Sequence, residues 1–138
     1  HGFSKYLNMV FRKASSAQVL KANMRIVGNC EYAILFYRDK LPKFNNNGNM
    51  VFNCWDWQKD VDTPKIHPTQ KPVRILERMI ELFTDPGDVV IDPVAGSGVT
   101  LLAAKNLGRS GYGFEIKKDF VKQSKEQILT MGQESLFT

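Results

Sequence analysis

The 138-residue sequence has few of the residues that cross-link a small protein or anchor it in a membrane. Its two cysteines, Cys30 and Cys54, sit in apolar surroundings without metal-ligand spacing, so we expect reduced core thiols rather than a disulfide or a metal site. No apolar run approaches the roughly 18 residues that cross a bilayer, and no signal-peptide pattern opens the chain. These absences argue against a disulfide scaffold and a membrane protein, and the cytoplasm is the expected compartment.

The sequence has fewer acidic than basic residues, but the basic residues do not form a continuous run. The chain carries 19 Lys and Arg against 14 Asp and Glu, which gives a net charge of +5 and a pI near 9.3. This balance favours a polyanionic partner. The apolar fraction of 43% and the charged fraction of 24% are typical of one soluble globular domain.

The second half of the chain shows alternating helix and strand patterns. We expect helices over 72–83, 97–107 and 118–131, and strands over 87–92 and 111–116. Val73, Leu76, Ile80 and Phe83 fall on one face of the first helix. Short links between such elements produce βαβ units, so the pattern predicts a parallel sheet.

The first half is less regular. We expect strands over 6–13 and 31–38, the second apolar throughout its middle and therefore covered on both faces. A short strand is expected over 50–57. Residues 14–29 have no clean period and are expected to form a loop with room for one helical turn, and 41–49 a second loop.

The sequence GDVVIDPVAGSGVT, residues 87–100, organises the chain. β-Branched residues that end in Asp92-Pro93 and continue through small residues into a helical pattern predict a buried strand, a tight turn and a helix start. Open α/β sheets bind ligands at such strand ends. Glycines let backbone N–H groups approach a ligand, and a helix start attracts anions. The same residues also serve simply to turn a chain.

Glu115 lies near the end of the next expected strand, 23 positions after Asp92. In dinucleotide-binding folds an acid about 20 residues beyond the glycine turn accepts hydrogen bonds from a ribose hydroxyl pair. On its own Glu115 is equally consistent with a solvated strand end. The preceding glycine turn favours the ribose role.

The segment His67-Pro68-Thr69-Gln70-Lys71-Pro72 precedes the expected helix over 72–83. Pro72 suits a first helical turn, where its missing N–H costs nothing, and Thr69 is a candidate cap. Lys71 is electrostatically misplaced there, because cations stabilise helix C-termini. It therefore suggests an anionic partner such as a ligand carboxylate, although a lysine that reaches solvent is the simpler interpretation.

The segments HPTQKP, VRILERMI and GDVVIDPVAGSGVTLLAAKNLGRSGYGFEI, in this order, resemble the paired cofactor motifs of the permuted (β-group) DNA amino-methyltransferases. The upstream segment YLNMVFRKASSAQVLKANMRIVGNCEYAILFYRDKLPKFN resembles the part that such enzymes place after their catalytic motif. The resemblance covers nearly the whole chain. It implies an α/β, Rossmann-like methyltransferase fold with a mainly parallel sheet and helices on both faces, incomplete in this chain. It also implies methyl transfer from S-adenosylmethionine to N6 of adenine or N4 of cytosine in DNA, in a bacterial or phage-encoded protein.

The resemblance implies roles for individual residues. Asp92 would hold the amino group of S-adenosylmethionine, directly or through water, and Glu115 the ribose hydroxyls. Lys71 and Thr69, with the backbone of residues 95–98, would meet the methionine end, and Ile116 would lie against the adenine. The expected cofactor-binding set is His67, Thr69, Gln70, Lys71, Pro72, Asp92, Pro93, Val94, Ala95, Gly96, Ser97, Gly98, Glu115 and Ile116, and no metal is expected.

Two departures from the family pattern matter. Val94 stands where the family usually has Phe, so we expect a smaller wall beside the cofactor and weaker affinity. The catalytic motif, Asp/Asn/Ser-Pro-Pro and an aromatic residue, is absent, because none of the six prolines are adjacent. In the permuted order this motif lies upstream of everything here. We therefore expect a truncated chain that has no catalytic residue of its own and that methylates nothing detectably by itself.

In the family, target recognition commonly lies between the strand EYAILFYR and HPTQKP, here the short interval 39–66. Its lysines, asparagines and tryptophans suit phosphate, base-edge and stacking contacts, and equally an ordinary surface loop with buried tryptophans. The candidate DNA contacts are Arg12, Lys13, Lys21, Arg25, Lys43, Asn45 and Lys59.

The expected organisation is a single methyltransferase domain over 1–138, with post-catalytic strands in 1–38, a recognition loop in 39–66 and the cofactor-binding region in 67–131. Double-stranded DNA is the expected partner, no membrane association is expected, and homodimerisation stays open. The alternative is a non-catalytic module that binds S-adenosylmethionine or nucleic acid. A nicotinamide dehydrogenase is disfavoured, because Gly96-Ser97-Gly98 lacks the third glycine of G-x-G-x-x-G and a pyrophosphate would crowd Asp92.

Overall fold

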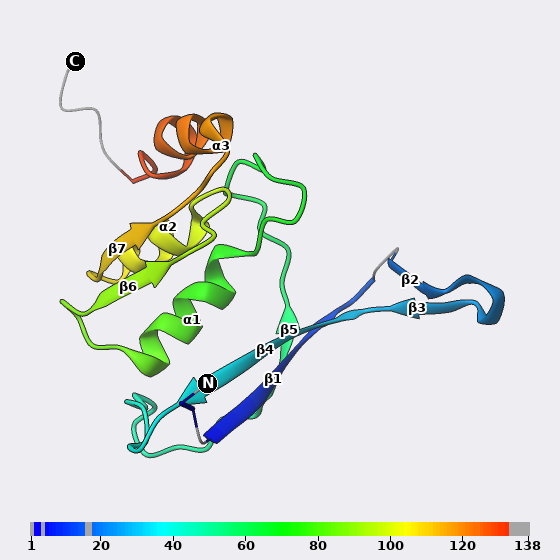
Figure 1. Ribbon diagram of the computed structural model, residues 1–138, viewed down its shortest axis with the longest axis horizontal. Helices are drawn as coiled ribbons and strands as arrows, with labels where there is room; N and C mark the ends of the chain where they lie inside the picture. Colours follow the sequence, from blue (N-terminus) through cyan, green and yellow to red (C-terminus); the bar gives the residue numbers. More distant parts are fainter. Residues whose placement is uncertain (1, 4, 16–17, 133–138) are drawn as a thin grey trace. The chain divides into compact units, whose positions relative to one another are not determined.

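The computed structural model describes residues 2, 3, 5–15 and 18–132 (Figure 1). The chain divides into two compact units, His1–Gln58 and Lys59–Thr138. The boundary falls inside the interval 39–66. No helix within the described ranges is long and apolar enough to cross a membrane.

The first unit is built on a three-stranded sheet. Strand β1 (Lys5–Lys13) lies between β4 (Cys30–Tyr37), which is antiparallel to it, and β5 (Cys54–Trp57), which is parallel. Met9 and Phe11 of β1 point to the covered face and are 4% and 5% exposed. The strands expected over 6–13 and 31–38 are therefore present and pair directly with each other.

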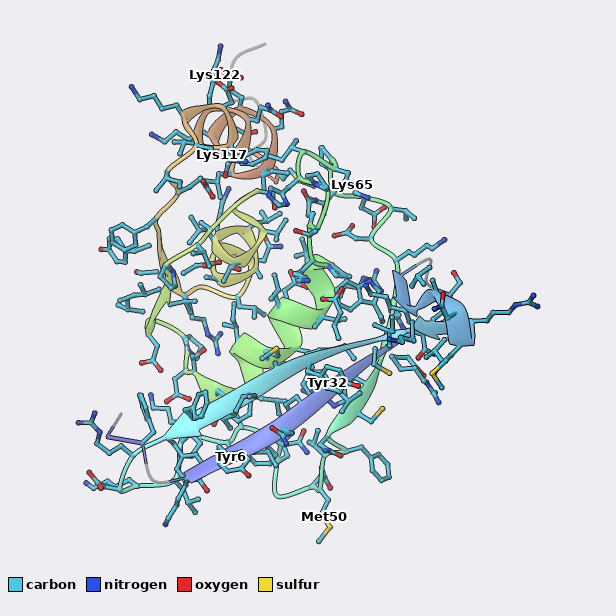
Figure 2. The ribbon with its side chains drawn as sticks, turned by 45° about the vertical axis from the view of Figure 1, so that its right-hand side comes forward. Tyr6, Tyr32, Met50, Lys65, Lys117 and Lys122 are labelled. Carbon is cyan, nitrogen blue, oxygen red and sulfur yellow. The ribbon has the colours of Figure 1, made fainter. Side chains whose placement is uncertain are left out.

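The expectation that the second of these strands is covered on both faces is wrong. Tyr32, Ile34 and Phe36 are 74%, 51% and 54% exposed, and Tyr6 stands on the same open face of the ladder (Figure 2). Side chains alternate between the faces of a strand. An apolar run identifies the strand, but only the neighbouring layers decide which of its faces is covered.

Within the segment 14–29, expected to be a loop with one helical turn, residues 18–28 form a β-hairpin around a 3-10 turn, and residues 16 and 17 lie outside the described residues. Strand β2 (Gln18–Lys21) pairs antiparallel with β3 (Ile26–Gly28), and the 3-10 turn η1 (Ala22–Met24) connects them. The register shifts between Val19 and Lys21. A shift of this kind interrupts the two-residue alternation of a strand, so the sequence shows no clean period. The hairpin continues the β1–β4 pair outward as a two-stranded arm (Figure 1).

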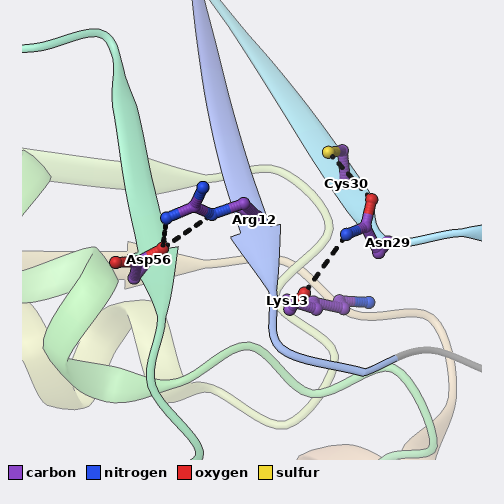
Figure 3. A network of polar contacts seen from close by, with 5 residues as sticks. All are labelled: Arg12, Lys13, Asn29, Cys30 and Asp56. Carbon is purple, nitrogen blue, oxygen red and sulfur yellow. Dashed lines mark hydrogen bonds and ion pairs between the residues drawn. The ribbon is translucent and has the colours of Figure 1, made fainter.

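A polar network joins the strands near the base of this arm (Figure 3). Arg12 donates two hydrogen bonds to Asp56 Oδ1, from Nε at 2.9 Å and from Nη2 at 2.8 Å, and thus links β1 to β5. The hydrogen bond and the charge of Asp56 raise the pKa of Arg12. Cys30 Sγ donates to Asn29 Oδ1 at 3.4 Å.

Cys30 and Cys54 are both free thiols, as expected, but they are not both core residues. Cys30 is half-buried and Cys54 is exposed. Cys54 opens β5, a strand of four residues in which exposed and half-buried side chains alternate. Because Cys54 holds an exposed position in this alternation, its side chain lies on the open face of the sheet.

The second unit contains the expected helices and strands, with somewhat shorter bounds. Its elements are α1 (Val73–Phe83), β6 (Val89–Asp92), α2 (Val99–Asn106), β7 (Ser110–Gly113) and α3 (Lys118–Gln123), which continues into the π-helical turn η2 (Ser124–Ile128). Strands β6 and β7 pair in parallel, as the βαβ pattern predicts. The molecule as a whole has mixed sheets, because β1 pairs with β4 in the antiparallel sense.

The core of the second unit lies between its helices and one face of β6 and β7. It comprises Val73, Ile80, Val99, Leu102, Ala103, Ala104 and Ile128. Leu76 and Phe83, which were expected on the buried face of α1, are half-buried, whereas Ile75 and Leu82 are buried. The prediction of the buried face of α1 was correct for Val73 and Ile80, but this face also includes Ile75 and Leu82.

Strand β6 is not buried on both sides. Val89 and Ile91 are 56% and 63% exposed, and Tyr112 beside them on β7 is 60% exposed. On the opposite face, Gly111 and Gly113 let helix α2 approach closely: a Cβ at Gly113 would lie 2.8 Å from Leu101 Cδ1 and 2.9 Å from Ala95 Cβ. A side chain at Gly113 would therefore clash with both α2 and the turn at Ala95.

Candidate functional site

Three separate segments of the second unit meet around one hollow of about 420 Å³. Small-molecule sites commonly have volumes of roughly 300–1,000 Å³. The lining residues are His67, Thr69, Gln70, Lys71, Asp92, Val94, Ala95, Gly96, Ser97, Val99, Thr100, Glu115, Ile116, Lys117 and Phe120. The hollow lies at the carboxyl ends of the parallel strands β6 and β7, where open α/β sheets bind ligands.

The turn after β6 is closed by its own hydrogen bonds. Asp92 Oδ1 accepts from Val94 N–H at 3.0 Å, Ala95 N–H donates to Phe114 O at 2.8 Å, and Gly98 N–H donates to Ala95 O at 2.8 Å. Gly96 and Gly98 have φ values of 52° and 80°, in the left-handed region that favours glycine. In the first turn of α2, the N–H groups of Leu101 and Leu102 donate to Gly98 O at 3.0 Å and 3.1 Å, so the N–H groups of Ser97, Val99 and Thr100 are the ones placed to donate to a ligand in the hollow.

Glu115 closes one side of the hollow. Its Oε1 accepts from Lys117 N–H at 2.8 Å, and its Oε2 accepts from Gly96 N–H at 3.0 Å, so it joins the segment after β7 to the glycine turn. The hydrogen bond from Lys117 lowers the pKa of Glu115, against the opposing effect of burial and with further help from Gly96, Ile116 and the charge of His67. An ionised carboxylate has about four acceptor positions, so Glu115 can still accept a hydrogen bond from a ligand.

The segment His67–Lys71 forms the facing wall. His67 Nδ1 accepts from Thr69 N–H at 3.2 Å, and Thr69 Oγ1 lies 3.1 Å from the same nitrogen. These two contacts of Thr69 orient the His67 ring through Nδ1. The His67 ring packs against Phe120 with 4.6 Å between ring centroids.

Gln70 stabilises the loop before α1. Its Oε1 accepts from Ile66 N–H at 3.2 Å, and its Nε2 donates to Pro64 O at 2.9 Å. Gln70 lines the hollow, but its amide is engaged by backbone groups on both sides. Its part in the site is to hold the segment His67–Lys71 in place.

The prediction of Thr69 as the helix cap is wrong. Helix α1 begins after Pro72 with no side-chain cap from the adjacent residues, and Asp60 Oδ2 accepts from Val73 N–H at 3.0 Å instead. Asp60 Oδ1 also accepts from the N–H groups of Thr63 and Asp62 at 3.0 Å and 3.2 Å. The cap comes from 13 positions upstream, which no local capping pattern could reveal.

Eleven of the fourteen cofactor-binding candidates line this hollow, and they come from three segments that are distant in sequence. Pro72, Pro93 and Gly98 lie in the same turns but not on the lining. The sequence analysis missed Val99, Thr100, Lys117 and Phe120. The first three directly follow predicted residues, so their position in the chain was the available signal, whereas Phe120 is brought in only by the start of α3.

The seven DNA-contact candidates do not converge in this way. Arg12 pairs with Asp56, and Lys13 pairs with Glu31 and lies 4.8 Å from the ring centroid of Trp57. Lys21 and Arg25 belong to the β2–β3 arm and are exposed. Lys43, Asn45 and Lys59 are exposed loop residues, with Lys59 in the second unit. Their contact with DNA stays a prediction.

A family profile for DNA methylases that modify N6 or N4 matches residues 4–126, most of the chain. The chain belongs to the N6/N4 DNA methylase family. The permuted order within that family stays a prediction. Among the described residues of this methylase chain, no three His, Cys, Asp or Glu side chains are grouped to hold a metal ion.

Curated relatives agree with the family assignment. The DNA adenine methyltransferase YhdJ of Escherichia coli K12 is 35% identical over 99 residues, 70% of this chain and 34% of the relative. The putative methylase YubD of the same organism is 31% identical over 127 residues, 92% of this chain and 52% of the relative. The methylase chain thus spans about a third to a half of these two proteins.

Solved structures show the same fold. M1.HpyAVI in complex with S-adenosylmethionine matches 90% of this chain and 61% of its own, with a TM-score of 0.72 and 28% identity. The cytosine-N4-specific PvuII methyltransferase matches 92% of this chain and 52% of its own, with a TM-score of 0.76 at 21% identity, which shows the fold alone. The expected α/β methyltransferase fold is therefore confirmed, and S-adenosylmethionine is the cofactor of the family.

Proposed function

We propose that this chain forms the S-adenosylmethionine-binding part of a DNA amino-methyltransferase that acts on adenine N6 or cytosine N4. The observation that carries the proposal is the convergence of Lys71, Asp92 and Glu115 on one hollow at the ends of β6 and β7. Family membership and a relative solved with this cofactor support the assignment.

The residues present fit the chemistry of the cofactor. S-adenosylmethionine carries an ammonium, a carboxylate, a sulfonium and a ribose diol. Asp92 and Glu115 are carboxylates suited to the ammonium and the diol, and Lys71 is a cation suited to the carboxylate. Gly96 adopts φ 52°, a conformation that favours glycine, and this keeps its N–H directed at Glu115 on the lining of the hollow.

When bound, the cofactor supplies an electrophilic methyl group to the exocyclic amine of the base. The residues of this chain bind and orient it. Glu115 holds the ribose while it fixes the glycine turn through Gly96 N–H, and His67, packed on Phe120, shapes the facing wall. The motif that binds the target amine is absent from the 138 residues, so in our proposal it belongs to a segment outside them.

The binding role is tested by calorimetric titration of the purified chain with S-adenosylmethionine. We expect Glu115→Ala to raise the dissociation constant about ten- to a hundredfold, because charge-assisted hydrogen bonds to the ribose are lost. Glu126→Ala removes an exposed carboxylate that does not line the hollow and is the matched control.

The control variant should bind within about twofold of the original chain, and NADH should not bind at all. An unchanged dissociation constant for Glu115→Ala would remove Glu115 from the site. If the unaltered chain binds NADH in place of S-adenosylmethionine, the proposed function is wrong.

A further inference from the structure

The β2–β3 arm, Gln18–Gly28, leaves much of its apolar surface open. Val19, Leu20 and Met24 are 60%, 60% and 65% exposed, and Ile26 and Val27 are 44% and 49% exposed. A two-stranded ribbon on its own is marginally stable in water, and contiguous exposed apolar surface commonly marks a contact site. The exposed apolar surface of the arm therefore indicates a binding site for a partner.

The excess of positive charge around the arm favours a polyanionic partner. Residues 1–30 contain five basic residues and no Asp or Glu, and Glu31 is the first acid of the chain. The other fourteen Lys and Arg balance the fourteen Asp and Glu, so the whole net charge of +5 resides in this stretch. The basic residues are Lys5, Arg12, Lys13, Lys21 and Arg25.

Two of these five cations are engaged within the first unit, and two are at the tip of the arm. Arg12 and Lys13 pair with Asp56 and Glu31 at its base. Lys21 and Arg25 flank the turn Ala22–Met24, are exposed, and have no ion-pair partner among the residues that the structure describes. Arg25 adopts φ 55° and donates its N–H to Ala22 O at 3.0 Å, so the turn holds it next to the exposed tip.

We propose that the β2–β3 arm enters a groove of duplex DNA, with Lys21 and Arg25 on the phosphates and the tip residues Asn23 and Met24 toward the bases. The major groove of B-DNA admits a two-stranded β-ribbon, and cations on such a ribbon bind phosphates. Asn side chains pair with adenine edges in that groove. This inference rests on the proposed function, which makes DNA the partner, and it identifies the surface of the chain that binds the DNA.

A second copy of the chain is the less suitable occupant. Two arms packed side by side would gather four cations, Lys21 and Arg25 of each copy, with no acid in either arm to pair with them. Juxtaposed like charges are unfavourable at an interface. Duplex DNA offers phosphates to the cations and base edges to the exposed tip.

The test measures binding of the 138-residue chain to a fluorescein-labelled 20-base-pair duplex by fluorescence anisotropy across a salt series. The arm variant is Lys21→Gln with Arg25→Gln. The matched control is Lys122→Gln with Lys125→Gln, which removes the same charge from exposed positions in the second unit, and Lys21→Arg with Arg25→Lys preserves charge in the arm.

We expect the arm variant to bind at least about tenfold more weakly, and the dependence of log K on log salt to become shallower by roughly two, one for each lost phosphate contact. The control and the charge-preserving variant should stay within about twofold. Circular dichroism checks that each variant is folded, and S-adenosylmethionine affinity should be the same in all of them.

Three results would overturn the proposal. One is equal loss in the arm and control variants, which would mean that binding follows net charge alone. Another is binding of the single strand as tight as that of the duplex, which would exclude a groove. The third is an arm variant that abolishes self-association in sedimentation velocity while DNA affinity is unchanged. Failure to bind S-adenosylmethionine would overturn the proposed function and leave this inference standing.

Discussion

At the scale of single residues, two carboxylates organise the second unit by accepting backbone N–H groups. Glu115 joins Gly96 to Lys117, and Asp60 joins Val73 to its own loop. Carboxylates in such positions act as structural acceptors as well as charges. In Glu115 this structural role and the proposed ribose contact use different lone pairs of one group, so the cofactor would bind to an acceptor that is already oriented.

Removal of the distant cap should destabilise the chain. We expect Asp60→Ala to lower the free energy of unfolding by about 1 kcal/mol, the usual cost of losing a helix N-cap. Asp62→Ala, two positions on and exposed, is the matched control and should change the free energy by less than about 0.5 kcal/mol. Urea denaturation of the three proteins measures both changes, and equal stability of Asp60→Ala and the original chain would contradict the capping role.

The contribution of Asp60 should also depend on pH. Burial raises the pKa of Asp60, but the hydrogen bonds from Val73, Thr63 and Asp62 outweigh it, so the net pKa is lowered. The stabilisation is therefore fully present above the unfolded pKa of about 4 and is lost as pH falls through the lower, folded pKa. The difference between the original chain and Asp60→Ala should be constant from pH 7 to pH 5 and shrink toward pH 3.

At the scale of elements, the approach of α2 to β7 couples packing to the site. Gly113 faces Leu101 of α2 and Ala95 of the glycine turn, and Ala95 lines the hollow. Leu101 can change rotamer to admit an added methyl group, but Ala95 can move only with its backbone. The position of the turn, and hence the shape of the hollow, therefore depends on a residue in the neighbouring strand that has no side chain.

Gly113→Ala tests this coupling. We expect the added methyl group to cost about 1–3 kcal/mol of folding free energy, as overpacking typically does, and to weaken S-adenosylmethionine binding by displacing Ala95. Ser110→Ala, at an exposed position of the same strand, should affect neither. Urea denaturation and calorimetric titration measure the two effects, and a stable variant with unchanged affinity would show that the contact at Gly113 relaxes without moving the turn.

At the scale of the whole molecule, the chain consists of two compact units and shares its fold with methyltransferases longer than itself. The open faces of β1–β4 and β6–β7 leave large apolar side chains exposed, among them Tyr6, Tyr32, Ile91 and Tyr112. Both faces are usually covered in α/β folds with parallel strands. The chain spans about a third of YhdJ and about half of YubD.

We expect the 138-residue chain alone to transfer no methyl group to DNA, even if it binds S-adenosylmethionine. Transfer requires a base swung out of the duplex and held with its amine in line with the methyl group, and the Pro-Pro-aromatic motif that holds it in the family is absent from the sequence. A radiolabel assay with tritiated cofactor and mixed-sequence DNA measures the transfer. Turnover comparable to that of a complete methylase would show that other residues hold the base.

The sequence alone determined the elements and most of the lining of the hollow wherever the signal was local. Apolar periodicity located α1 and α2, β-branched residues located β6, and the motifs HPTQKP and DPVAGSG named most of the lining of the hollow. These signals depend on the spacing of neighbouring side chains, which sequence records directly. Where that spacing was interrupted, as at the register shift between Val19 and Lys21, the arm was mistaken for a loop.

Only the tertiary structure decided the contacts between residues far apart in the chain. Asp60 replaced Thr69 as the cap of α1, Phe120 joined the wall formed by His67, and Tyr32 and Ile91 were left on open faces. Each of these outcomes depends on which segment comes to lie beside another. Burial and long-range capping are properties of such neighbours in space, and a one-dimensional pattern does not contain them.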